Sequence, residues 1–323
     1  MEIVYICPKS CFPLDLSSNK IFGAICVGIR AIYGEEELNE MLSLFHGNDI
    51  PFIISSAFPF VDGPKDEEKH HFFPKLITEP DKTEDLGSAK KFKKVEYVDE
   101  SIFNGWINGK IAESAIIKVF DDRYKTKDKL LFSKGVELKF KLAVGDVPHN
   151  QLNRLSSRSD NFYYSKGRYF DNAGLFFLIR FFDDKFKSKI KYALRFIEDR
   201  GFGGDISSGE GQFEIKSEMK STEMIDEPDE ADTFTTLSLY SPTDEFNSFD
   251  KDRIWYEMVK LRGRCGDGVM KKSLLMLKEG STFPIIDREF YGKVREVRPD
   301  PRRMVEYGIA FPIKVKIRMN GEE

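Results

Sequence analysis

The spacing of apolar residues predicts a strand and two helices at the start of the chain. Glu2–Cys7 is a short run of apolar and β-branched residues, which is typical of a strand. Apolar residues then recur at three- and four-residue spacing, which predicts a helix that is capped by Ser17 or Ser18 and ends at Gly34. Glu35–Phe45 predicts a second helix, because its three leading glutamates suit the positive end of a helix dipole.

Two further strands, a third helix and a glycine-rich loop are predicted in the middle of the chain. Val136–Val144 alternates apolar and polar residues and predicts a strand, whereas Gly174–Phe182 is almost continuously apolar and predicts a buried central strand. Lys187–Asp199 has its apolar residues on one helical face. The loop Gly201–Gly211 ends this helix, and Gln212–Ile215 resumes as a strand.

The order of these elements predicts an α+β fold. Strand, helix, insertion, two strands, helix, glycine loop and strand follow the split βαβ order of a ferredoxin-like unit. Asp62–Glu100 is charged and has little periodicity, so we expect a loop or insertion there. Lys220–Asp232 is acidic and lacks an apolar period, which predicts a linker or an exposed hairpin tip. Short strands of a second, β-rich half are predicted within Thr233–Tyr240, Ser273–Leu277, Phe283–Ile286 and Ala310–Ile317.

Length and composition are those of a globular chain with a sizeable core. The 323 residues are 41% hydrophobic and 32% charged, with a net charge of −4. We expect two domains, or one with large insertions, since single cores stop growing at roughly 250–300 residues. The longest apolar runs, such as Ala173–Ile179, are far shorter than the roughly 20 residues that span a bilayer, and Met1–Ile6 does not resemble a signal peptide. We therefore expect a cytoplasmic protein with reduced cysteines.

The cysteines and histidines predict no metal site, and no motif predicts a cofactor. The four cysteines lack a paired C-x-x-C arrangement. Cys7, Cys11 and His46 are a conceivable ligand set, but the turn between the two cysteines is one residue too long for the usual zinc knuckle and no second pair follows. The four histidines lack the H-x-x-x-H and H-E-x-x-H spacings of histidine-based metal sites.

Glycines are concentrated in the loop between the third helix and the strand that follows it. Five glycines in eleven positions, with Ser207 and Ser208 among them, can present main-chain N–H groups and hydroxyls to a phosphate or a neighbouring chain. Neither a Walker loop nor a dinucleotide fold fits, because both join a strand to a helix, and the lysine of a Walker loop is absent. A long turn without a ligand is the alternative.

Three segments have residues that favour a nucleic acid, although the net charge does not. Lys260–Lys278 has six basic residues against one acidic residue. Asn150–Arg168 interleaves four basic residues with three aromatic residues, which offer stacking surfaces to unpaired bases. Ser17, Ser18 and Lys20 stand at a helix start, where unpaired N–H groups favour phosphate. Solvated basic loops and a simple helix cap are the alternatives.

Nine segments between residues 13 and 312 resemble a known family. They are Pro13–Ala24, Ser55–Phe60, Phe73–Leu76, His149–Arg154, Asp171–Phe177, Gly201–Phe213, Leu237–Tyr240, Lys278–Ser281 and Tyr307–Pro312. In this order they resemble the RAMP proteins of CRISPR effector complexes, and within them the family of the fourth subunit of the type III-A Csm complex. The sequence departs from the family at Asp205, where an arginine or lysine is common. A carboxylate there would repel phosphate.

The resemblance implies two ferredoxin-like (RRM-like) units that form a non-catalytic, RNA-binding subunit. The first unit, residues 1–219, would have an insertion at about residues 55–135 and the RAMP glycine-rich loop at 201–211. After an acidic linker or hairpin at 220–232, a second, degenerate unit would occupy residues 233–323. In antiviral defence, the subunit would hold the crRNA 5′ handle and contact the large Palm-domain subunit and the backbone RAMP subunit of the Csm complex. No membrane partner is expected.

Two alternatives to RNA binding are an enzyme and a purely structural bridge between larger subunits. A metal-independent crRNA-processing endoribonuclease would use His149 as a general base on a ribose 2′-OH. No second acid or base neighbours His149 in the sequence, so we expect no enzyme activity. The predicted RNA-binding residues are Ser17, Ser18, Lys20, His149, Asn150, Arg154, Arg158, Gly201, Gly203, Gly204, Ser207, Ser208, Gly209 and Gly211.

Overall fold

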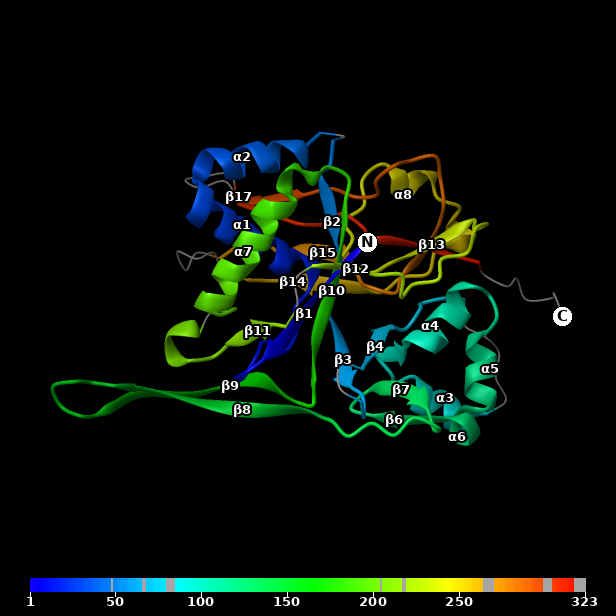
Figure 1. Ribbon diagram of the computed structural model, residues 1–323, viewed down its shortest axis with the longest axis horizontal. Helices are drawn as coiled ribbons and strands as arrows, with labels where there is room; N and C mark the ends of the chain where they lie inside the picture. Colours follow the sequence, from blue (N-terminus) through cyan, green and yellow to red (C-terminus); the bar gives the residue numbers. More distant parts are fainter. Residues whose placement is uncertain are drawn as a thin grey trace.

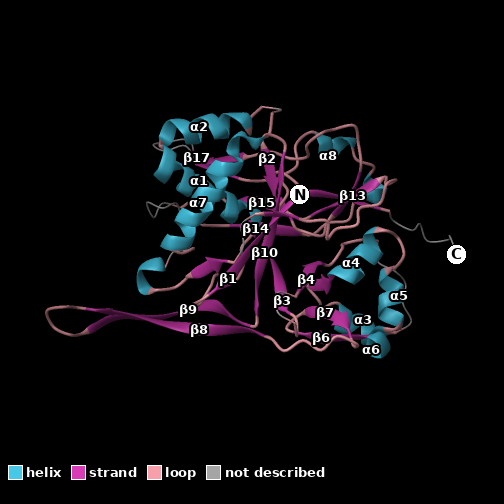
Figure 2. Ribbon diagram, in the orientation of Figure 1, coloured by secondary structure: helices cyan, strands magenta, loops and turns pink. Residues whose placement is uncertain are grey.

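A large sheet with helices packed against it forms the body of the molecule, and a long two-stranded arm projects from this body (Figure 1). The structure is a computed structural model that describes residues 1–47, 49–65, 68–79, 85–203, 205–216, 219–263, 270–298 and 304–316. Figure 2 shows that most of the strands converge on the centre of the body, while the helices lie in two groups on either side. The fold is therefore α+β, as the sequence predicts.

The large sheet is mixed and contains the strands of the first two thirds of the chain other than the two strands of the arm. The strands of this sheet are β1 (Glu2–Pro8), β2 (Phe52–Ile54), β3 (Phe58–Asp62), β4 (Lys69–Pro74), β5 (Tyr97–Asp99), β6 (Tyr124–Lys127), β7 (Leu130–Ser133), β10 (Ala173–Phe181), β11 (Phe213–Ile215) and β12 (Lys220–Ser221). The order is β11-β1-β10-β3-β4-β5-β7-β6, with β12 also paired to β1 and β2 to β10. The strands predicted at Glu2–Cys7, Gly174–Phe182 and Gln212–Ile215 are confirmed to within one residue.

Helices α1 (Ser18–Tyr33), α2 (Glu35–Leu44) and α7 (Lys187–Arg200) form one group, as the sequence predicts. The buried face of α1 consists of residues at helical spacing, including Ile21, Ile25 and Ile29. Gly34, with φ +93°, ends α1 and begins α2. None of the helices in the described part of the chain is long and apolar enough to cross a membrane.

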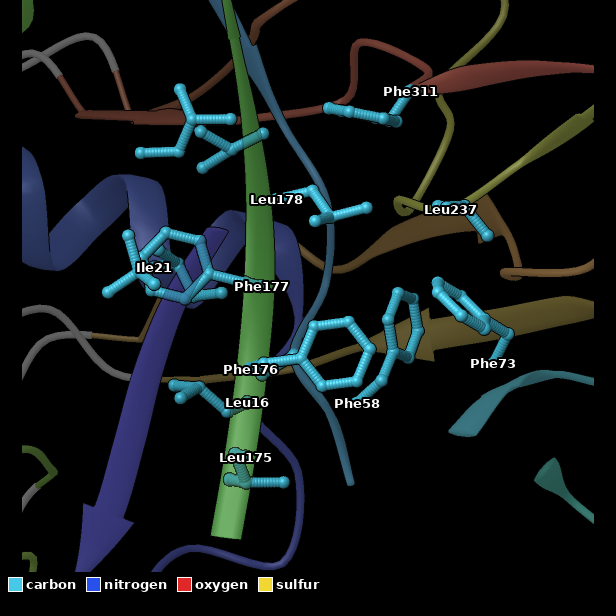
Figure 3. Packing of buried hydrophobic residues seen from close by; sticks show 14 of the residues in the cluster. Leu16, Ile21, Phe58, Phe73, Leu175, Phe176, Phe177, Leu178, Leu237 and Phe311 are labelled. Atoms are coloured by element: carbon cyan, nitrogen blue, oxygen red, sulfur yellow. The ribbon is translucent and has the colours of Figure 1, made fainter. Parts of the chain in front are cut away.

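Aromatic rings fill the core between β10 and its neighbours (Figure 3). Phe176 of β10 contacts Phe58 of β3 and Phe73 of β4, with ring centroids 6.0 Å and 5.5 Å away. Both pairs meet edge to face, which is the favoured arrangement for aromatic rings. Residues 174–178 of β10 are buried because strands cover both edges of β10 and side chains cover both of its faces.

A loop or an insertion is predicted at Asp62–Glu100. The prediction of a loop is wrong, because β4, β5 and a helix lie there. Together with the residues up to Ser133 this segment forms a lobe at the far end of the sheet (Figure 1). Asp85 and Asp99 cap two of its helices, since each Oδ1 accepts a backbone N–H at 2.9 Å. The elements are too short to give a readable period. The helices are α3 (Leu86–Phe92), α4 (Glu100–Ile107), α5 (Glu113–Lys118) and α6 (Phe120–Arg123).

The arm is a long antiparallel hairpin of β8 (Lys141–Leu152) and β9 (Ser159–Asp171). The predicted strand at Val136–Val144 is therefore wrong in its bounds, because residues 136–140 precede β8. The sequence also gave no sign of β9. Side chains on both faces of the arm keep contact with solvent, so neither strand has the apolar alternation of a half-buried strand.

The second half of the chain forms small antiparallel sheets. Their orders are β16-β13-β19, β14-β15 and β17-β18. The four strands that the sequence predicts in this half are each confirmed in part, while β14, β17 and β18 were missed. The elements are β13 (Thr233–Thr236), β14 (Met258–Leu261), β15 (Leu274–Leu277), β16 (Thr282–Pro284), β17 (Arg295–Arg298), β18 (Met304–Glu306), β19 (Pro312–Val315), α8 (Glu245–Ser248) and the 3-10 turn η3 (Lys251–Arg253).

The two halves share one apolar core. Leu237 and Tyr307 belong to the same buried cluster as Phe22 of α1. The rings of Phe22 and Tyr307 lie 5.0 Å apart, and the Tyr307 hydroxyl accepts a hydrogen bond from the backbone N–H of Ile54 at 3.1 Å. The second half therefore closes over the start of α1 and the end of β2.

Candidate nucleic-acid interface

Both ends of the glycine loop are fixed to the body. Gly201 (φ +92°) ends α7, and its N–H donates to the carbonyl of Ile197 at 2.8 Å. Gly211 (φ +70°) donates to the carbonyl of Cys11 at 2.7 Å, and a Cβ there would lie 1.8 Å from the carbonyl oxygen of Phe202. Both glycines are buried. Their predicted role as open donors to RNA is therefore not supported, because protein carbonyls already take both amides.

The middle of the glycine loop faces solvent. Gly203, Ser207 and Gly209 are exposed. The 3-10 turn η2 (Ile206–Ser208) lies between Gly203 and Gly209. Ser208 is exposed too, but its N–H and its hydroxyl both donate to the carbonyl of Asp205, at 3.0 Å and 2.7 Å. Gly204 lies outside the described residues. The open part of the loop thus offers the Ser207 hydroxyl and the main chain around Gly203.

The segment after β1 joins the glycine loop to the arm. The N–H of Phe12 donates to the carbonyl of Arg168 on β9 at 2.9 Å, and the N–H of Arg168 returns to the carbonyl of Phe12 at 2.8 Å. On its other side, Cys11 accepts the hydrogen bond from Gly211. The rings of Phe12 and Phe202 stack with centroids 6.0 Å apart. The loop and the arm are therefore held in one local arrangement.

His149 lies on the face of the arm that turns toward the glycine loop. Its ring stacks on that of Tyr163, its cross-strand partner, with centroids 4.7 Å apart and planes 9° apart. Its Nε2 lies 2.8 Å from the Ser165 hydroxyl and 3.3 Å from Glu210 Oε1 in the loop. The side chain is only 12% exposed. The structure thus brings together two segments that the sequence assigned to RNA.

The opposite face of the arm exposes aromatic and basic side chains. Phe162 and Tyr164 are 59% and 62% exposed, and their rings meet edge to face with centroids 5.1 Å apart. Lys166 follows on the same face, because side chains of a strand alternate with a period of two, and it is exposed as well. Asn150, the cross-strand partner of Phe162, accepts a hydrogen bond from the Ser159 hydroxyl at 2.6 Å. We call Phe162, Tyr164 and Lys166 the outer face.

Arg154 and Arg158 lie in the turn at the tip of the arm. The N–H of Asn153 donates to the carbonyl of Arg158 at 2.9 Å and closes this turn. Both arginines are exposed. The tip projects away from the body (Figure 1), so the structure does not bring these two arginines to the glycine loop.

The start of α1 is buried against other parts of the body. Ser17 occupies the N-cap position, but its hydroxyl donates to Asn19 Oδ1 at 2.8 Å, so the predicted capping bond is not made. The Ser56 hydroxyl instead accepts the N–H of Ser18 at 2.9 Å, and the Ser18 hydroxyl accepts the N–H of Leu239 at 3.1 Å. Both serines are buried. Their hydroxyls thus bond to the protein, which leaves no support for the predicted contact with RNA.

Two predicted basic features are partly neutralised by carboxylates. Lys20 at the start of α1 forms an ion pair with Asp15 at 2.6 Å. In the predicted basic segment of the second half, Lys271 pairs with Glu306 at 2.6 Å and Lys278 with a glutamate at 3.2 Å. Arg264 of that segment lies outside the described residues. Among the described residues, Lys271 and Lys278 of this segment have carboxylate partners, whereas the lysines and arginines of the arm form no ion pair.

A half-buried tyrosine, a buried histidine and a partly exposed glutamate form a chain of hydrogen bonds that the sequence did not predict. The Tyr5 hydroxyl lies 2.7 Å from His71 Nε2, and His71 Nδ1 lies 3.0 Å from Glu100 Oε2. Burial raises the pKa of Tyr5 to about 12, with a further contribution from the Glu100 charge. His71 and Glu100 line a cavity of about 500 Å³. The three residues are far apart in the sequence, and the pairing of β3, β4 and β10 brings them together.

No family model matches the sequence. A curated relative, the CRISPR system Cms protein Csm4 of Thermococcus onnurineus (strain NA1), is 27% identical over 319 residues, which cover 97% of this chain and 96% of the relative. Two solved structures share the fold. A chain of the Csm3-Csm4 subcomplex in the type III-A CRISPR-Cas interference complex has a TM-score of 0.68 at 18% identity, over 98% of this chain and 100% of that one. A chain of the Csm1-Csm4 cassette in complex with pppApA has a TM-score of 0.62 at 22% identity, over 98% of both chains.

The full-length match and the shared α+β fold make the chain similar to CRISPR-associated proteins, in agreement with its resemblance to the RAMP class. The sequence segments that carry the resemblance to RAMP proteins include the loop fixed by Gly201 and Gly211. Within this class, the chain is similar to a Csm4 protein over almost its full length and shares its fold with chains of Csm4-containing complexes.

Proposed function

We propose that the chain is the non-catalytic, RNA-binding subunit of a type III-A CRISPR (Csm) interference complex and that it holds the 5′ handle of the crRNA. Similarity to a Csm4 protein over almost the full length, together with the shared fold, supports the place in such a complex. The single observation that carries RNA binding is the outer face of the arm, which exposes two aromatic rings and a lysine on the side opposite the glycine loop. Handle RNA is single-stranded, so its bases are free to stack on such a surface.

We also propose that the first part of the chain is a ferredoxin-like unit. Its elements β1, α1, β3, β10, α7 and β11 follow the βαββαβ sequence of that unit. The sheet order β11-β1-β10-β3 puts the strands in the order fourth, first, third, second, which supports this assignment. The three-stranded sheet β16-β13-β19 is the basis for a second, degenerate unit in residues 233–323.

Stacking on the outer face would supply much of the affinity. Phe162 and Tyr164 meet edge to face, so each ring keeps one face open to a base. Each stacked base contributes on the order of 1–3 kcal/mol. Lys166 on the same face supplies a cation for the RNA backbone, and the arm as a whole has five basic and three acidic residues in a chain whose net charge is −4.

The path of the RNA backbone would avoid the carboxylates of the glycine loop. Asp205 is exposed and Glu210 lies beside His149, so phosphate is repelled from this side of the arm. The exposed Ser207 hydroxyl and the main chain near Gly203 are the loop groups that remain open to RNA. We therefore propose that the handle runs along the outer face and touches the loop only at its exposed middle.

The proposed partners in the complex are the large Palm-domain subunit and the backbone RAMP subunit. Solved structures with this fold are named for complexes of Csm4 with Csm1 and with Csm3, which supports one partner of each kind. A subunit between them would bridge the base of the complex. Co-purification of the chain with each neighbouring subunit tests this part of the proposal separately from RNA binding.

The binding of labelled handle RNA to the purified full-length chain tests the RNA-binding proposal. Fluorescence anisotropy should show tighter binding to handle RNA than to a scrambled RNA of equal length. Phe162→Ala and Tyr164→Ala should each weaken binding by about tenfold, which corresponds to the loss of one stacked base. Tyr192→Ala is the matched control, because Tyr192 is 56% exposed on α7 and lies away from the outer face. Equal affinity for both RNAs, with no effect of either arm variant, would contradict the proposal.

RNA length after incubation tests the absence of catalysis. Ser165 and the stacked ring of Tyr163 hold His149, and the described contacts of His149 include no second histidine. We expect repeat RNA to keep its full length during incubation with the protein. Cleavage that is lost in His149→Ala would instead identify a ribonuclease.

A further inference from the structure

His149, Asp205 and Glu210 bring one imidazole and two carboxylates together between the arm and the glycine loop. One ligand atom of each residue lies within 4.8 Å of those of the other two. Imidazole nitrogen and carboxylate oxygen are the donors that hold Zn²⁺ and its neighbours in the first transition series. We propose that these three residues form a binding site for a divalent transition-metal ion of the Zn²⁺ type.

A buried oxygen of Glu210 is the second, independent observation. The Oε1 atom is buried and accepts no hydrogen bond from the described residues, although His149 Nε2 lies only 3.3 Å away. His149 Nε2 is within hydrogen-bond distance of the Ser165 hydroxyl instead. The ion pairs of Glu210 and Asp205 in the described part of the chain include no lysine or arginine. A buried carboxylate oxygen without a donor is costly, and a bound cation removes that cost.

The separation of the two best-placed ligand atoms suits a tetrahedral ion. Metal–ligand bonds of 2.0–2.1 Å give a tetrahedron with edges of about 3.4 Å. The distance of 3.3 Å between His149 Nε2 and Glu210 Oε1 is close to this edge. Asp205 is exposed on the loop, so a change of rotamer can bring its carboxylate to the third vertex.

The surroundings of His149 favour binding through Nε2. The stack with Tyr163 fixes the plane of the imidazole and turns Nε2 toward the loop. The Ser165 hydroxyl can rotate about its Cβ–Oγ bond and release Nε2 to the ion. Three protein ligands leave a fourth tetrahedral position for water or an incoming oxygen ligand.

The ion would fasten the arm to the glycine loop and neutralise the loop. The ion pair of His149 with Glu210 joins the two elements directly, in addition to the backbone bonds that Phe12 and Cys11 make to them. An ion bound by β8 and by the loop would link them directly. It would also cancel the two negative charges of Asp205 and Glu210. The site is argued from these side chains alone and does not depend on RNA binding.

Titration of the tag-free, chelator-treated full-length chain with Co²⁺ tests the proposal. Co²⁺ takes the place of Zn²⁺ and reports its ligands through visible absorption. We expect one Co²⁺ per chain, displaced by one Zn²⁺. Glu210→Gln and His149→Gln should each weaken Co²⁺ binding by about tenfold or more. Loss of a residue that only supports a metal ligand already lowers metal affinity by about 10–100-fold. Asp205→Asn should also weaken Co²⁺ binding.

Glu214→Gln is the matched control. Glu214 lies four residues after Glu210, on β11, and forms an ion pair with Lys9 at 3.0 Å. Its variant should bind Co²⁺ as the unmodified chain does, and circular dichroism should show that all variants keep the native fold. Absence of a Co²⁺ signal in the unmodified chain, or the same affinity in Glu210→Gln and Glu214→Gln, would overturn the proposal.

Discussion

Gly28 of α1 and Ala193 of α7 lie so close that a Cβ on Gly28 would be 2.7 Å from the Cβ of Ala193 and 2.8 Å from its backbone. The glycine therefore sets the separation of the two helices. Gly28→Ala should reduce the free energy of unfolding by about 1–3 kcal/mol, because the helices must move apart. Urea unfolding followed by circular dichroism measures this change.

Gly23→Ala on the same helix is the control for Gly28→Ala. A Cβ on Gly23 meets nothing within 4 Å, so only the helix propensity changes. This variant should be more stable by up to about 1 kcal/mol. If both alanines changed the stability alike, the close approach of α1 and α7 would not be the cause.

Gly167 allows the segment after β1 to cross the arm. A Cβ on Gly167 would lie 1.7 Å from the sulfur of Cys11, so Gly167→Ala should destabilise the protein by about 1–3 kcal/mol. Cys11→Ala removes the sulfur that the new methyl group meets. Gly167→Ala should therefore cost much less stability in the Cys11→Ala variant than in the unmodified chain. Thermal unfolding of the single variants and the double variant measures both costs. Two additive losses would argue against this contact.

Lys166 should add a cation to the RNA interface. If it contacts a phosphate, Lys166→Ala should reduce the slope of log K against log salt by about 0.7, the value for one contact with a single strand. Lys185→Ala is a suitable control, because Lys185 is committed to an ion pair with Glu40 on the helical side of the body. Anisotropy titrations with handle RNA at several salt concentrations measure both slopes, and an unchanged slope for Lys166→Ala would remove this residue from the interface.

Stability at high pH should depend on Tyr5. Burial and the Glu100 charge raise the pKa of Tyr5 to about 12, whereas an unfolded tyrosine titrates near 10. The stabilisation is complete below pH 10 and is lost as the pH rises from 10 to 12, because the unfolded chain loses this proton first. Tyr5→Phe should therefore lessen the fall in unfolding free energy across this interval by about 1–3 kcal/mol. Tyr164→Phe, which removes an exposed hydroxyl, should leave the fall in unfolding free energy between pH 10 and pH 12 unchanged. Parallel curves of unfolding free energy against pH for Tyr5→Phe and the unmodified chain would contradict the prediction.

Elements with a strong and long apolar pattern were predictable. The helices α1 and α7 bury one face each, so their apolar residues follow a helical period that the sequence displays. The strand β10 is covered on both sides, so it has an apolar run that marks it as central. Of these three elements, α7 marks the start of the glycine loop, which leads to the predicted strand β11.

Most of the arm could not be predicted from its pattern, although the alternation of Val136–Val144 overlaps the start of β8. Alternation marks a strand only when one face is buried, and the arm keeps both faces partly in solvent. Phe162 and Tyr164 are exposed, which is consistent with their interpretation as stacking surfaces and not with packing on the sheet. The lobe between β4 and β7 escaped prediction for another reason, since its elements are only three to eight residues long.

The candidate site was predictable only in part. The exposed middle of the glycine loop and the position of His149 beside it agree with the segments that the sequence singled out. Ser17 and Ser18 fit a helix cap equally well by composition, but their bonds to Ser56 and Leu239 depend on tertiary packing. Metal-ligand motifs are recognised by short spacings, so a set that joins His149 to Glu210 across the fold gives no such signal.

The shared core has a consequence for how the chain is made. Tyr307 lies near the C-terminus and packs on Phe22 near the N-terminus, so the first helix cannot be fully covered until almost the whole polypeptide has left the ribosome. A nascent chain that ends before β13 would expose Phe22 to water and to chaperones. Truncation between the halves is therefore expected to yield aggregated material, even though the acidic stretch there looks in sequence like a convenient place to cut.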